Sequence, residues 1–370
     1  MKNVLYSILL YVNFLLAAFL LLSYLSVFVN PEIFWLMAFM GLAYPFLLII
    51  NIIFAIFWMF RWNKIFLVSL ISILIGWNNI TNHFQIPLSR KNIDKTFNDK
   101  VDNIKTIKVL SYNVRLFDRY NWSEQKDAKD KIINFILSNN PDILCLQEYF
   151  TSAKSDLSER KIKSVLKQYK YSHVYYNIKT KDLSNFGIVT FSKYPIIEKG
   201  VIKFENTFNT GIYTDIKTNN DTIRIYNNHL QSIKLKSKNY DFFTRLSLRD
   251  QEQLKEFKDI SSRLRYAYIM RARQVDLISK HAEDSPFPVI LCGDFNDTPV
   301  SYTYKKVKGN MKDAFVESGI WTGSTYVGSL PSFRIDYLFF DKKRFNSYNY
   351  RTHRVAFSDH YPISCYFELK

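Results

Sequence analysis

Cysteine and glycine are both scarce in this 370-residue chain, which contains 3 Cys and 10 Gly. The spacing of Cys145, Cys292 and Cys365 gives neither a disulfide framework nor a zinc site. Each cysteine lies in an apolar run and is predicted to be a small buried hydrophobe. The chain also lacks a Gly-x-x-x-x-Gly-Lys loop and a Gly-x-Ser-x-Gly turn. These absences exclude P-loop phosphate binding and the serine chemistry of the nucleophile elbow.

Charge is nearly absent from residues 1–80, whose only charged side chains are Lys2, Glu32, Arg61 and Lys64. Three apolar runs fill this region, at Val4–Val29, Ile33–Phe60 and Ile65–Ile80. About 20 apolar residues cross a bilayer, so the first two runs are long enough, and Pro45 in the second is tolerated there. A cleaved signal peptide is the alternative for the first run, but its apolar stretch is too long and no small-x-small site follows. We therefore predict an N-terminal bundle of about three transmembrane helices over residues 1–80.

The short loops predict how these helices are oriented. Lys2 favours a cytoplasmic N-terminus. The loop "VNPEI" carries no positive charge and is expected outside, whereas Arg61 and Lys64 are expected inside. The third run is short and ends in Gly-Trp-Asn-Asn. If it crosses the membrane, the rest of the chain faces away from the cytoplasm, as we predict. Without that crossing, the rest of the chain is cytoplasmic.

A polar linker, residues 81–104, leads into a regular pattern of strands and helices over residues 105–370. Apolar spacing predicts a helix at 130–140, which Pro141 ends. Strands are predicted at 107–114, 142–148, 187–191, 212–218, 222–230, 288–294, 334–340 and 363–369. Several successive strands have no helix between them, which favours an α/β sandwich with helices outside over a doubly wound parallel sheet. The longest interruption, 232–284, is predicted to be an insertion of two helices.

Positive charge dominates this second region. The chain has 50 Lys and Arg against 33 Asp and Glu, and only three of the former and one of the latter precede residue 81, so the remainder carries a net +15. Residues 232–273 alone contain 11 basic and 5 acidic side chains. This stretch is either a solvated helical face or a basic arm for phosphates or anionic headgroups.

Polar side chains recur where the predicted strands end. They are Asn113, Glu148, His229, Asp294, Asn296, Asp336, Asp359 and His360. Singly, an Asn or Asp at a strand end is usually a turn former. If the strands are neighbours in one sandwich, however, these groups converge on one edge. Carboxylate and amide oxygens suit Mg²⁺, and two histidines could polarise a phosphoryl group or move protons near neutral pH. The inventory is typical of phosphate-ester hydrolysis.

Seven motifs in order carry a family resemblance: "SYNV", "LQE", "GIVTFSKYPI", "NNHL", "GDFND", "RIDY" and "SDHYPI". Over about residues 105–370 the chain resembles the endonuclease/exonuclease/phosphatase superfamily, the metal-dependent hydrolases related to deoxyribonuclease I. The resemblance implies a four-layered α/β sandwich with two mixed sheets inside. "GDFNDTPVSYTY" and "PSFRIDYLFF" behind an N-terminal membrane region look like a membrane-anchored bacterial subgroup. This likeness, together with the predicted topology, implies a multi-pass protein of the inner (cytoplasmic) membrane with a periplasmic catalytic domain.

The resemblance also implies a role for each polar residue. Glu148 would be the principal ligand of Mg²⁺, or of Mn²⁺, with Asn113 beside it and Asp359 completing the metal site.

The remaining five residues would be catalytic. His360 would contact the scissile phosphate or activate water, and Asp336 would hold its imidazole. Asp294 would position the nucleophile or the leaving-group proton, Asn296 would donate to the developing negative charge, and His229 would donate to the phosphate from the other side.

One position departs from the family pattern. In deoxyribonuclease I a carboxylate partners the histidine that matches His229. Here Asn185 stands near that position and Asp182 only at some distance. His229 is therefore expected to be neutral and to bind rather than to transfer a proton.

Three functions remain open because fold and metal do not name a substrate. The first is a membrane-anchored Mg²⁺-dependent phosphodiesterase, nuclease-like or acting on other extracytoplasmic phosphoesters. The second is a hydrolase of phospholipid or lipid-linked headgroups, for which residues 239–248 would supply an apolar loop. The third, a catalytically inactive binding module, predicts a broken constellation. The aromatic and basic residues of 301–310 could stack bases or simply pack. The implied partners are the membrane and a phosphate-ester substrate, nucleic acid or lipid headgroup, with no obligate protein partner.

Overall fold

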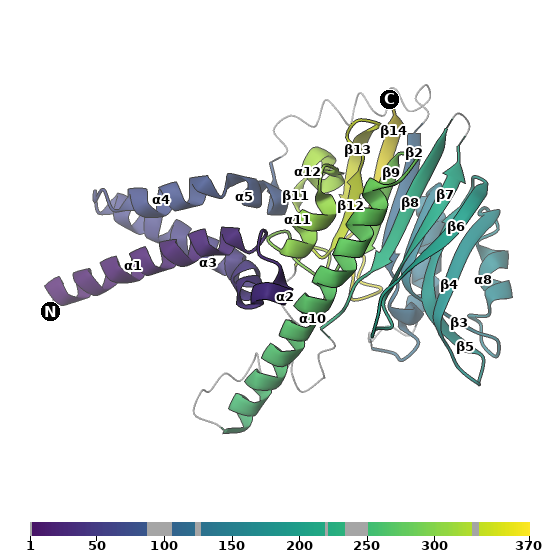
Figure 1. Cartoon of the computed structure of the whole chain (residues 1–370), viewed down its shortest axis with the longest axis horizontal. Coiled ribbons are helices and arrows are strands. Elements are labelled where there is room, and N and C mark those ends of the chain that lie inside the picture. Colours follow the sequence, from purple (N-terminus) through teal and green to yellow (C-terminus); the bar gives the residue numbers. More distant parts are fainter. Residues whose placement is uncertain (1, 87–105, 123–126, 219–220, 234–250, 328–332) are drawn as a thin grey trace.

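A computed structural model describes residues 2–86, 106–122, 127–218, 221–233, 251–327 and 333–370. An elongated group of apolar helices projects from a sandwich of two β-sheets (Figure 1). The N-terminus lies at the far end of the helices and the C-terminus on the sandwich. The helical part comprises α1 (Lys2–Leu25), α2 (Pro31–Phe34), α3 (Leu36–Phe60), α4 (Phe66–Ile75) and α5 (Trp77–His83).

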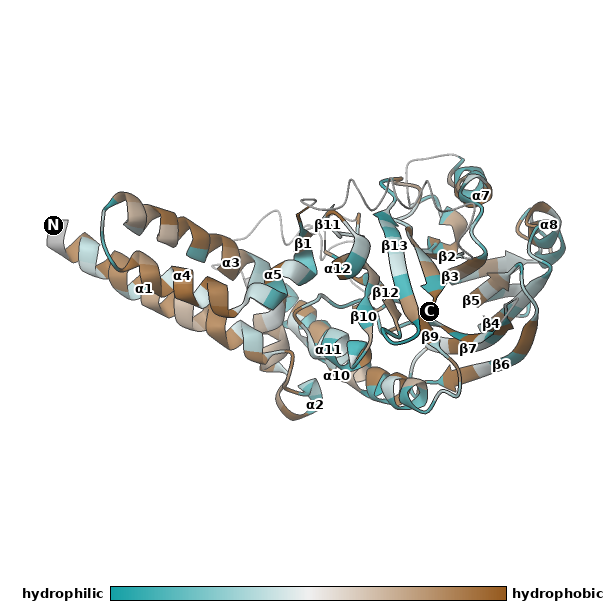
Figure 2. Ribbon diagram, turned by 90° about the horizontal axis from the view of Figure 1, so that it is seen from above, coloured by the Kyte–Doolittle hydropathy of each residue, from teal (hydrophilic) through white to brown (hydrophobic). Residues whose placement is uncertain are grey.

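Two of these helices, α1 and α3, are long and apolar enough to cross a membrane, a test that a signal sequence near the N-terminus also passes. The third predicted run is divided at Gly76 into α4, which has only ten residues, and the polar α5. A Cβ at Gly76 would lie 2.2 Å from the ring of Tyr24, so α1 packs closely there. Buried polar contacts also join the helices, because the Asn13 amide donates to Ser69 Oγ at 2.9 Å. Helices α1, α3 and α4 lie side by side (Figure 2).

Two six-stranded sheets form the sandwich. The first runs in the order β13-β14-β2-β3-β5-β4 and the second in the order β10-β12-β9-β8-β7-β6. Strands β2 and β3 are parallel, as are β8 and β9, and the other neighbours are antiparallel, so both sheets are mixed. The first sheet contains β2 (Thr106–Asn113), β3 (Ile143–Ser152), β4 (Tyr171–Lys179), β5 (Ser184–Ser192), β13 (Phe345–Thr352) and β14 (Ile363–Leu369). The second contains β6 (Ile196–Lys203), β7 (Thr210–Lys217), β8 (Thr222–His229), β9 (Val289–Asp294), β10 (Lys312–Asp313) and β12 (Asp336–Phe340).

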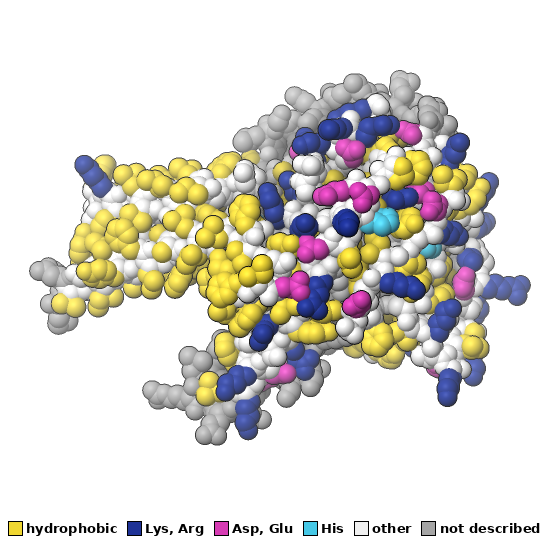
Figure 3. Space-filling model, viewed as in Figure 1, with side chains coloured by type: hydrophobic (Ala, Val, Ile, Leu, Met, Phe, Trp, Pro, Cys, Tyr) yellow, Lys and Arg dark blue, Asp and Glu magenta, His cyan; other side chains and the backbone are white. Residues whose placement is uncertain are grey.

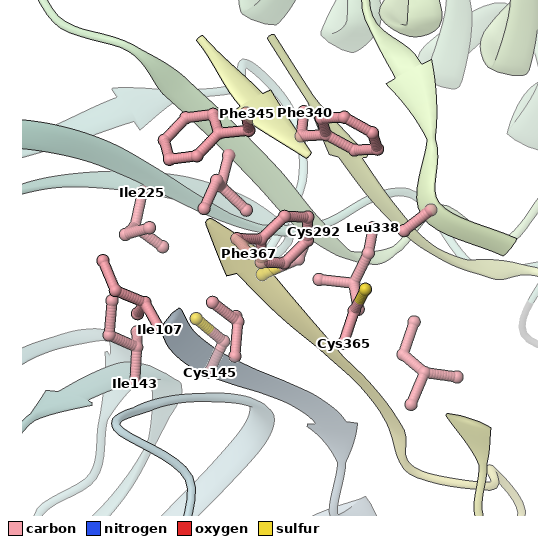
Figure 4. Close-up of a cluster of buried hydrophobic side chains, with 14 of the residues drawn as sticks. Ile107, Ile143, Cys145, Ile225, Cys292, Leu338, Phe340, Phe345, Cys365 and Phe367 are labelled. Atoms are coloured by element: carbon pink, nitrogen blue, oxygen red, sulfur yellow. The ribbon is translucent and has the colours of Figure 1, made fainter. Parts of the chain in front are cut away.

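Side-chain alternation explains why the central strands are apolar throughout. In β2, Ile107 and Val109 enter the core between the sheets, whereas Leu110 and Tyr112 enter the core beneath the outer helices. A strand buried on both faces has no polar face, so its sequence is a continuous apolar run. Figure 4 shows the core between the sheets, where Cys145, Cys292 and Cys365 are packed as the sequence predicts.

Helices cover both outer faces of the sandwich (Figure 2). Residues of α7 (Ala128–Asn139) and α8 (Glu159–Val165) join the core of the first sheet. Residues of α10 (Gln251–Glu283) and α11 (Tyr302–Lys308) join the core of the second. The predicted sandwich, with two mixed sheets between helical layers, is therefore confirmed.

Two helices were predicted over residues 232–284, and the described part of this segment contains one helix. Residues 251–283 form one helix of 33 residues, α10. Residues 234–250, which include the whole apolar segment 239–248, lie outside the described residues. In 301–310 the tyrosines pack: Tyr304 is buried and its hydroxyl donates to Asp313 at 2.9 Å.

The helical part is attached to the sandwich by direct contacts as well as by the chain. Arg273 of α10 donates to Glu32 Oε1 at 2.5 Å, and Val300 is buried in one cluster with apolar residues of α1 and α3. The predicted linker also begins in ordered structure. Strand β1 (Phe84–Gln85) pairs with β11 (Trp321–Thr322), beside the short helix α12 (Ala314–Ser318), and the Arg334 guanidinium donates to the Asn82 carbonyl at 2.9 Å.

Candidate active site

Strand direction brings the predicted residues to one edge of the sandwich. The parallel pairs β2/β3 and β8/β9 end at this edge, which places Asn113, Glu148, His229 and Asp294 there. Asp336 is directly opposite Asp294 in the antiparallel β9/β12 ladder. The expected convergence is therefore found for these five residues.

Glu148 reaches the edge because of a bulge in β3. The pairing of β3 with β5 shifts register between Leu146 and Tyr149, and Glu148 has a left-handed φ of 49°. A bulge re-aims a side chain in this way. The Asn113 amide then donates to Glu148 Oε1 at 3.3 Å and to Asp294 Oδ2 at 3.0 Å. The neighbouring Gln147 is turned inward and donates to Asn227 Oδ1 at 2.7 Å, which connects the two sheets beneath the site.

His360 and Asp336 form a buried pair at the centre. Nδ1 of His360 lies 2.9 Å from Asp336 Oδ2, and its Nε2 lies 3.6 Å from Asp294 Oδ2. Burial alone would lower the pKa of the imidazole, but the negative charges of Asp336 and Asp294 outweigh burial and raise that pKa well above its usual value. These charges favour the protonated imidazole, in which Nδ1–H donates to Asp336. Burial raises the pKa of the Asp294 carboxyl.

Asn296 fixes the Asp294 carboxylate. Its backbone N–H donates to Asp294 Oδ1 at 2.8 Å, and its side-chain amide donates to Asp294 Oδ2 at 3.2 Å and to the Leu230 carbonyl at 3.0 Å. These bonds require the left-handed φ of 54° at Asn296, which Asn tolerates better than most residues. The donation from Asn296 to a phosphate stays a prediction.

His229, like His360, lies close to the Asp294 carboxylate. Its Nε2 lies 3.7 Å from both Glu148 Oε1 and Asp294 Oδ2. The two residues considered as its partners make other contacts: Asn185 donates to Thr151 Oγ1 at 3.4 Å, and Asp182 accepts from the Ser184 hydroxyl at 3.2 Å. The carboxylates nearest to His229 in the described structure are thus those of the site itself.

Asp359 is held at the rim by Ser358 and Arg115. The Ser358 hydroxyl lies 3.2 Å from Asp359 Oδ1 and also donates to the Asn113 carbonyl at 2.8 Å. Nε of Arg115 lies 3.2 Å from Asp359 Oδ2. The sequence reasoning missed Arg115, although a basic residue two positions after Asn113 was a signal that could have found it.

The donor set fits a divalent cation. Although 30% of the Glu148 side chain reaches solvent, burial of its carboxyl and then the charge of Asp359 raise its pKa to about 7. Carboxylates that repel one another in this way are relieved by a cation, and carboxylate and amide oxygens are the ligands that Mg²⁺ takes. Asp294, Asp336 and His360 also have ligand atoms within 4.8 Å of one another. There, however, His360 Nδ1 and Asp336 Oδ2 are already hydrogen-bonded to each other.

Comparison with known proteins identifies the family of the chain. The profile of the Endonuclease/Exonuclease/phosphatase family matches residues 110–360, and that of a domain of unknown function matches residues 6–83. The first match covers more than half of the chain, so the protein belongs to the endonuclease/exonuclease/phosphatase family. Membership of this family supports a hydrolase that acts on phosphoester bonds. No curated protein matches the chain.

Solved structures show the same fold. A protein of this family from Bacteroides thetaiotaomicron superposes with a TM-score of 0.52 at 17% identity, covering 72% of this chain and 99% of that one. The catalytic domain of human Nocturnin, solved with bound sulfate, gives a TM-score of 0.51 at 17% identity, covering 72% and 95%. A family member from Beutenbergia cavernae gives 0.51 at 15% identity, covering 71% and 72%. At these identities the likeness concerns the fold alone.

Proposed function

We propose that this protein is a membrane-anchored, Mg²⁺-dependent phosphodiesterase with nuclease-like activity. The observation that carries the proposal is the buried Asp294–His360–Asp336 arrangement beside Glu148 and Asn113. A cation bound by Glu148 and Asp359, next to the fixed imidazole of His360, would supply the groups that hydrolysis of a phosphoester needs.

The proposed roles are those that the family resemblance implies. Glu148, Asn113 and Asp359 would hold Mg²⁺, and Mn²⁺ would fit the same oxygen donors. When bound, the cation would polarise a phosphoryl oxygen as a Lewis acid.

The protein groups supply the remaining chemistry. Asp294, fixed by Asn113 and Asn296, would orient the attacking water and take its proton. His360, held by Asp336 through Nδ1, would direct its Nε2–H to a phosphoryl oxygen. His229 would bind the phosphate from the side of Glu148. Preorganised donors of this kind stabilise charge that develops in the transition state.

The proposed anchor, residues 1–80, contains α1, α3, α4 and the first part of α5. Residues 81–104 would be the linker and residues 105–370 the catalytic domain. Apolar side chains cover the surface of the helical part, whereas Lys and Arg are spread over the sandwich (Figure 3). A surface of that kind needs lipid or partner protein around it. With three crossings and Lys2 inside, the catalytic domain would be periplasmic in a bacterium.

A hydrolase of lipid headgroups is the second candidate. The observation that favours it is the direct contact between sandwich and helical part, at Arg273–Glu32 and around Val300. These contacts would keep the active site close to the membrane.

The test uses the full chain in detergent or nanodiscs, assayed with Mg²⁺, Mn²⁺ or chelator. Substrates are plasmid DNA, RNA, a chromogenic phosphodiester, and vesicles of anionic or zwitterionic phospholipid. We expect metal-dependent cleavage of nucleic acid that Asp294→Asn and His360→Ala abolish. Asp182→Asn, which changes an exposed carboxylate in the β4–β5 turn, is the matched control and should keep full activity.

Two other outcomes would change the assignment. Headgroup release with nucleic acid intact would establish the lipid hydrolase instead. Equal turnover by wild type and Asp294→Asn would overturn the proposed active site.

A further inference from the structure

A short left-handed turn follows Asn113 at the rim of the site. Four consecutive non-glycine residues, Arg115 to Asp118, have φ values between 42° and 56°. This conformation costs roughly 1–2 kcal/mol per residue, so it persists only where the surroundings impose it. The surroundings are the buried Phe117 and Asp118, together with the bond from the Arg115 N–H to Asn113 Oδ1 at 3.0 Å.

The turn sets a row of cations and aromatic rings beside the active site. The Arg115 guanidinium lies 4.8 Å from the centre of the Trp122 ring while its Nε contacts Asp359. The rings of Trp122 and Tyr120 are 4.9 Å apart. Arg119 lies 5.8 Å from the Tyr120 ring and 4.3 Å from that of Phe150, which holds it in place. We call Arg115, Arg119, Tyr120 and Trp122 the aromatic shelf.

About half of the surface of each aromatic residue of the shelf is exposed. Tyr120 is 53% exposed and Trp122 is 47% exposed, although both lie next to a charged, polar site. Two large rings exposed together are more than the scattered apolar residues of an ordinary surface. A flat ligand could stack on them.

The charges of Arg115 and Arg119 determine which kind of ligand the two rings would bind. An aromatic pair can also hold a quaternary ammonium headgroup, through cation–π attraction. Here two guanidinium groups already lie over these rings and would repel such a headgroup. They attract a phosphate instead. A ligand with a planar base and an adjacent phosphate satisfies both parts of the shelf, as in the stacking platforms of single-strand-binding proteins.

We propose that the aromatic shelf binds single-stranded nucleic acid, with a base stacked on Tyr120 and Trp122 and a backbone phosphate at Arg115. This inference rests on the proposed phosphodiesterase function and names its substrate class. Arg115 Nε lies 3.2 Å from Asp359 Oδ2, and Asp359 is a proposed metal ligand. A phosphate bound at Arg115 would therefore be next to the phosphate that is cleaved. The stacked base would therefore belong to a nucleotide next to the scissile bond.

The experiment compares two strands that differ only in their bases. One is an oligothymidylate, and the other has the same length and charge but carries abasic tetrahydrofuran sites. The full chain is assayed on both with Mg²⁺, as wild type, Trp122→Ala, Trp122→Phe and Tyr120→Ala. Trp62→Ala is the matched control, because Trp62 is 97% exposed at the turn between α3 and α4, far from the sandwich (Figure 1).

We expect Trp122→Ala to lower kcat/KM on oligothymidylate by roughly fivefold to a hundredfold, the range for one stacked base. It should leave the abasic strand unchanged, and Trp122→Phe should keep most of the activity. Equal losses on both strands, or equal kcat/KM of the wild type on both, would overturn the shelf while leaving the phosphodiesterase intact. Lipid hydrolysis without strand cleavage would also overturn it. Cleavage that survives Asp294→Asn would instead overturn the proposed active site.

Discussion

At the scale of single residues, the His360–Asp336 pair makes the sharpest prediction. Replacing Asp336 by Asn removes a negative charge 2.9 Å from His360 Nδ1, so the raised pKa of His360 should fall. The charged imidazole would then be lost at a lower pH, and the alkaline limb of the pH–rate profile should move to lower pH. We expect kcat to drop by about 100-fold or more, as for a general acid–base group. An unmoved alkaline limb would assign that limb to another group.

Glu148 predicts how metal binding depends on pH. Its pKa of about 7 without metal, set first by burial and then by Asp359, means that Mg²⁺ competes with a proton. Affinity should be constant above pH 8 and fall about tenfold per pH unit below 7. Calorimetry in buffers of different ionisation enthalpy would measure the proton released. Glu148→Gln should weaken binding and release none, whereas release equal to wild type would place the metal elsewhere.

Sequence reasoning named the polar residues that meet at the site, apart from Arg115, but not their geometry. Asn113, Asp294 and His360 could be named from strand ends and motif order. The bulge that turns Glu148, and the left-handed turn that aims Arg115 at Asp359, could not be named. Both depend on non-glycine residues with positive φ, a conformation that only tertiary contacts select.

At the scale of elements, the strands that the sequence missed share one property. Strands β4, β6 and β13 are edge strands, as is the two-residue β10. An edge strand has less buried surface and avoids long apolar runs. β13, for example, reads Phe-Asn-Ser-Tyr-Asn-Tyr-Arg-Thr. Apolar periodicity therefore predicted the inner strands of both sheets but not their edge strands.

The close approach of β8 and β9 predicts that Gly293 cannot be replaced. It has a φ of 135°, and a Cβ there would lie 1.9 Å from the Asn228 carbonyl, which is backbone and cannot move aside. Gly293→Ala should therefore displace Asp294 and abolish activity with a lower Tm.

Gly309→Ala is its control, because Gly309 also has a positive φ but the nearest atom to its Cβ would be 3.7 Å away. Backbone strain alone should cost about 1–3 kcal/mol there, with activity kept. If both variants lost the same stability and kept activity, the close contact at Gly293 would be irrelevant to the site.

At the scale of the whole molecule, a buried histidine predicts acid sensitivity. His173 lies between the sheets with Nδ1 2.9 Å from Thr214 Oγ1, and burial, followed by the charge of Lys199, lowers its pKa to about 4. An unfolded histidine titrates near 6.5, so between about pH 6.5 and 4 the unfolded chain binds the extra proton. The stability due to His173 is therefore complete above pH 6.5 and is lost as the pH falls through this window. Melting curves of wild type and His173→Gln should show a smaller decline for the variant, and parallel declines would contradict the assignment.

The helical part also covers surface of the sandwich through the contacts between the two. Strand β11 is paired by β1, Arg334 is capped by the Asn82 carbonyl, and Val300 is covered by α1 and α3. A chain cut at residue 105 would leave that strand edge and that apolar patch open to water. The helical part thus shields surface of the sandwich from water, and we predict that residues 105–370 aggregate when they are made alone and recover when residues 1–86 are supplied as a separate polypeptide.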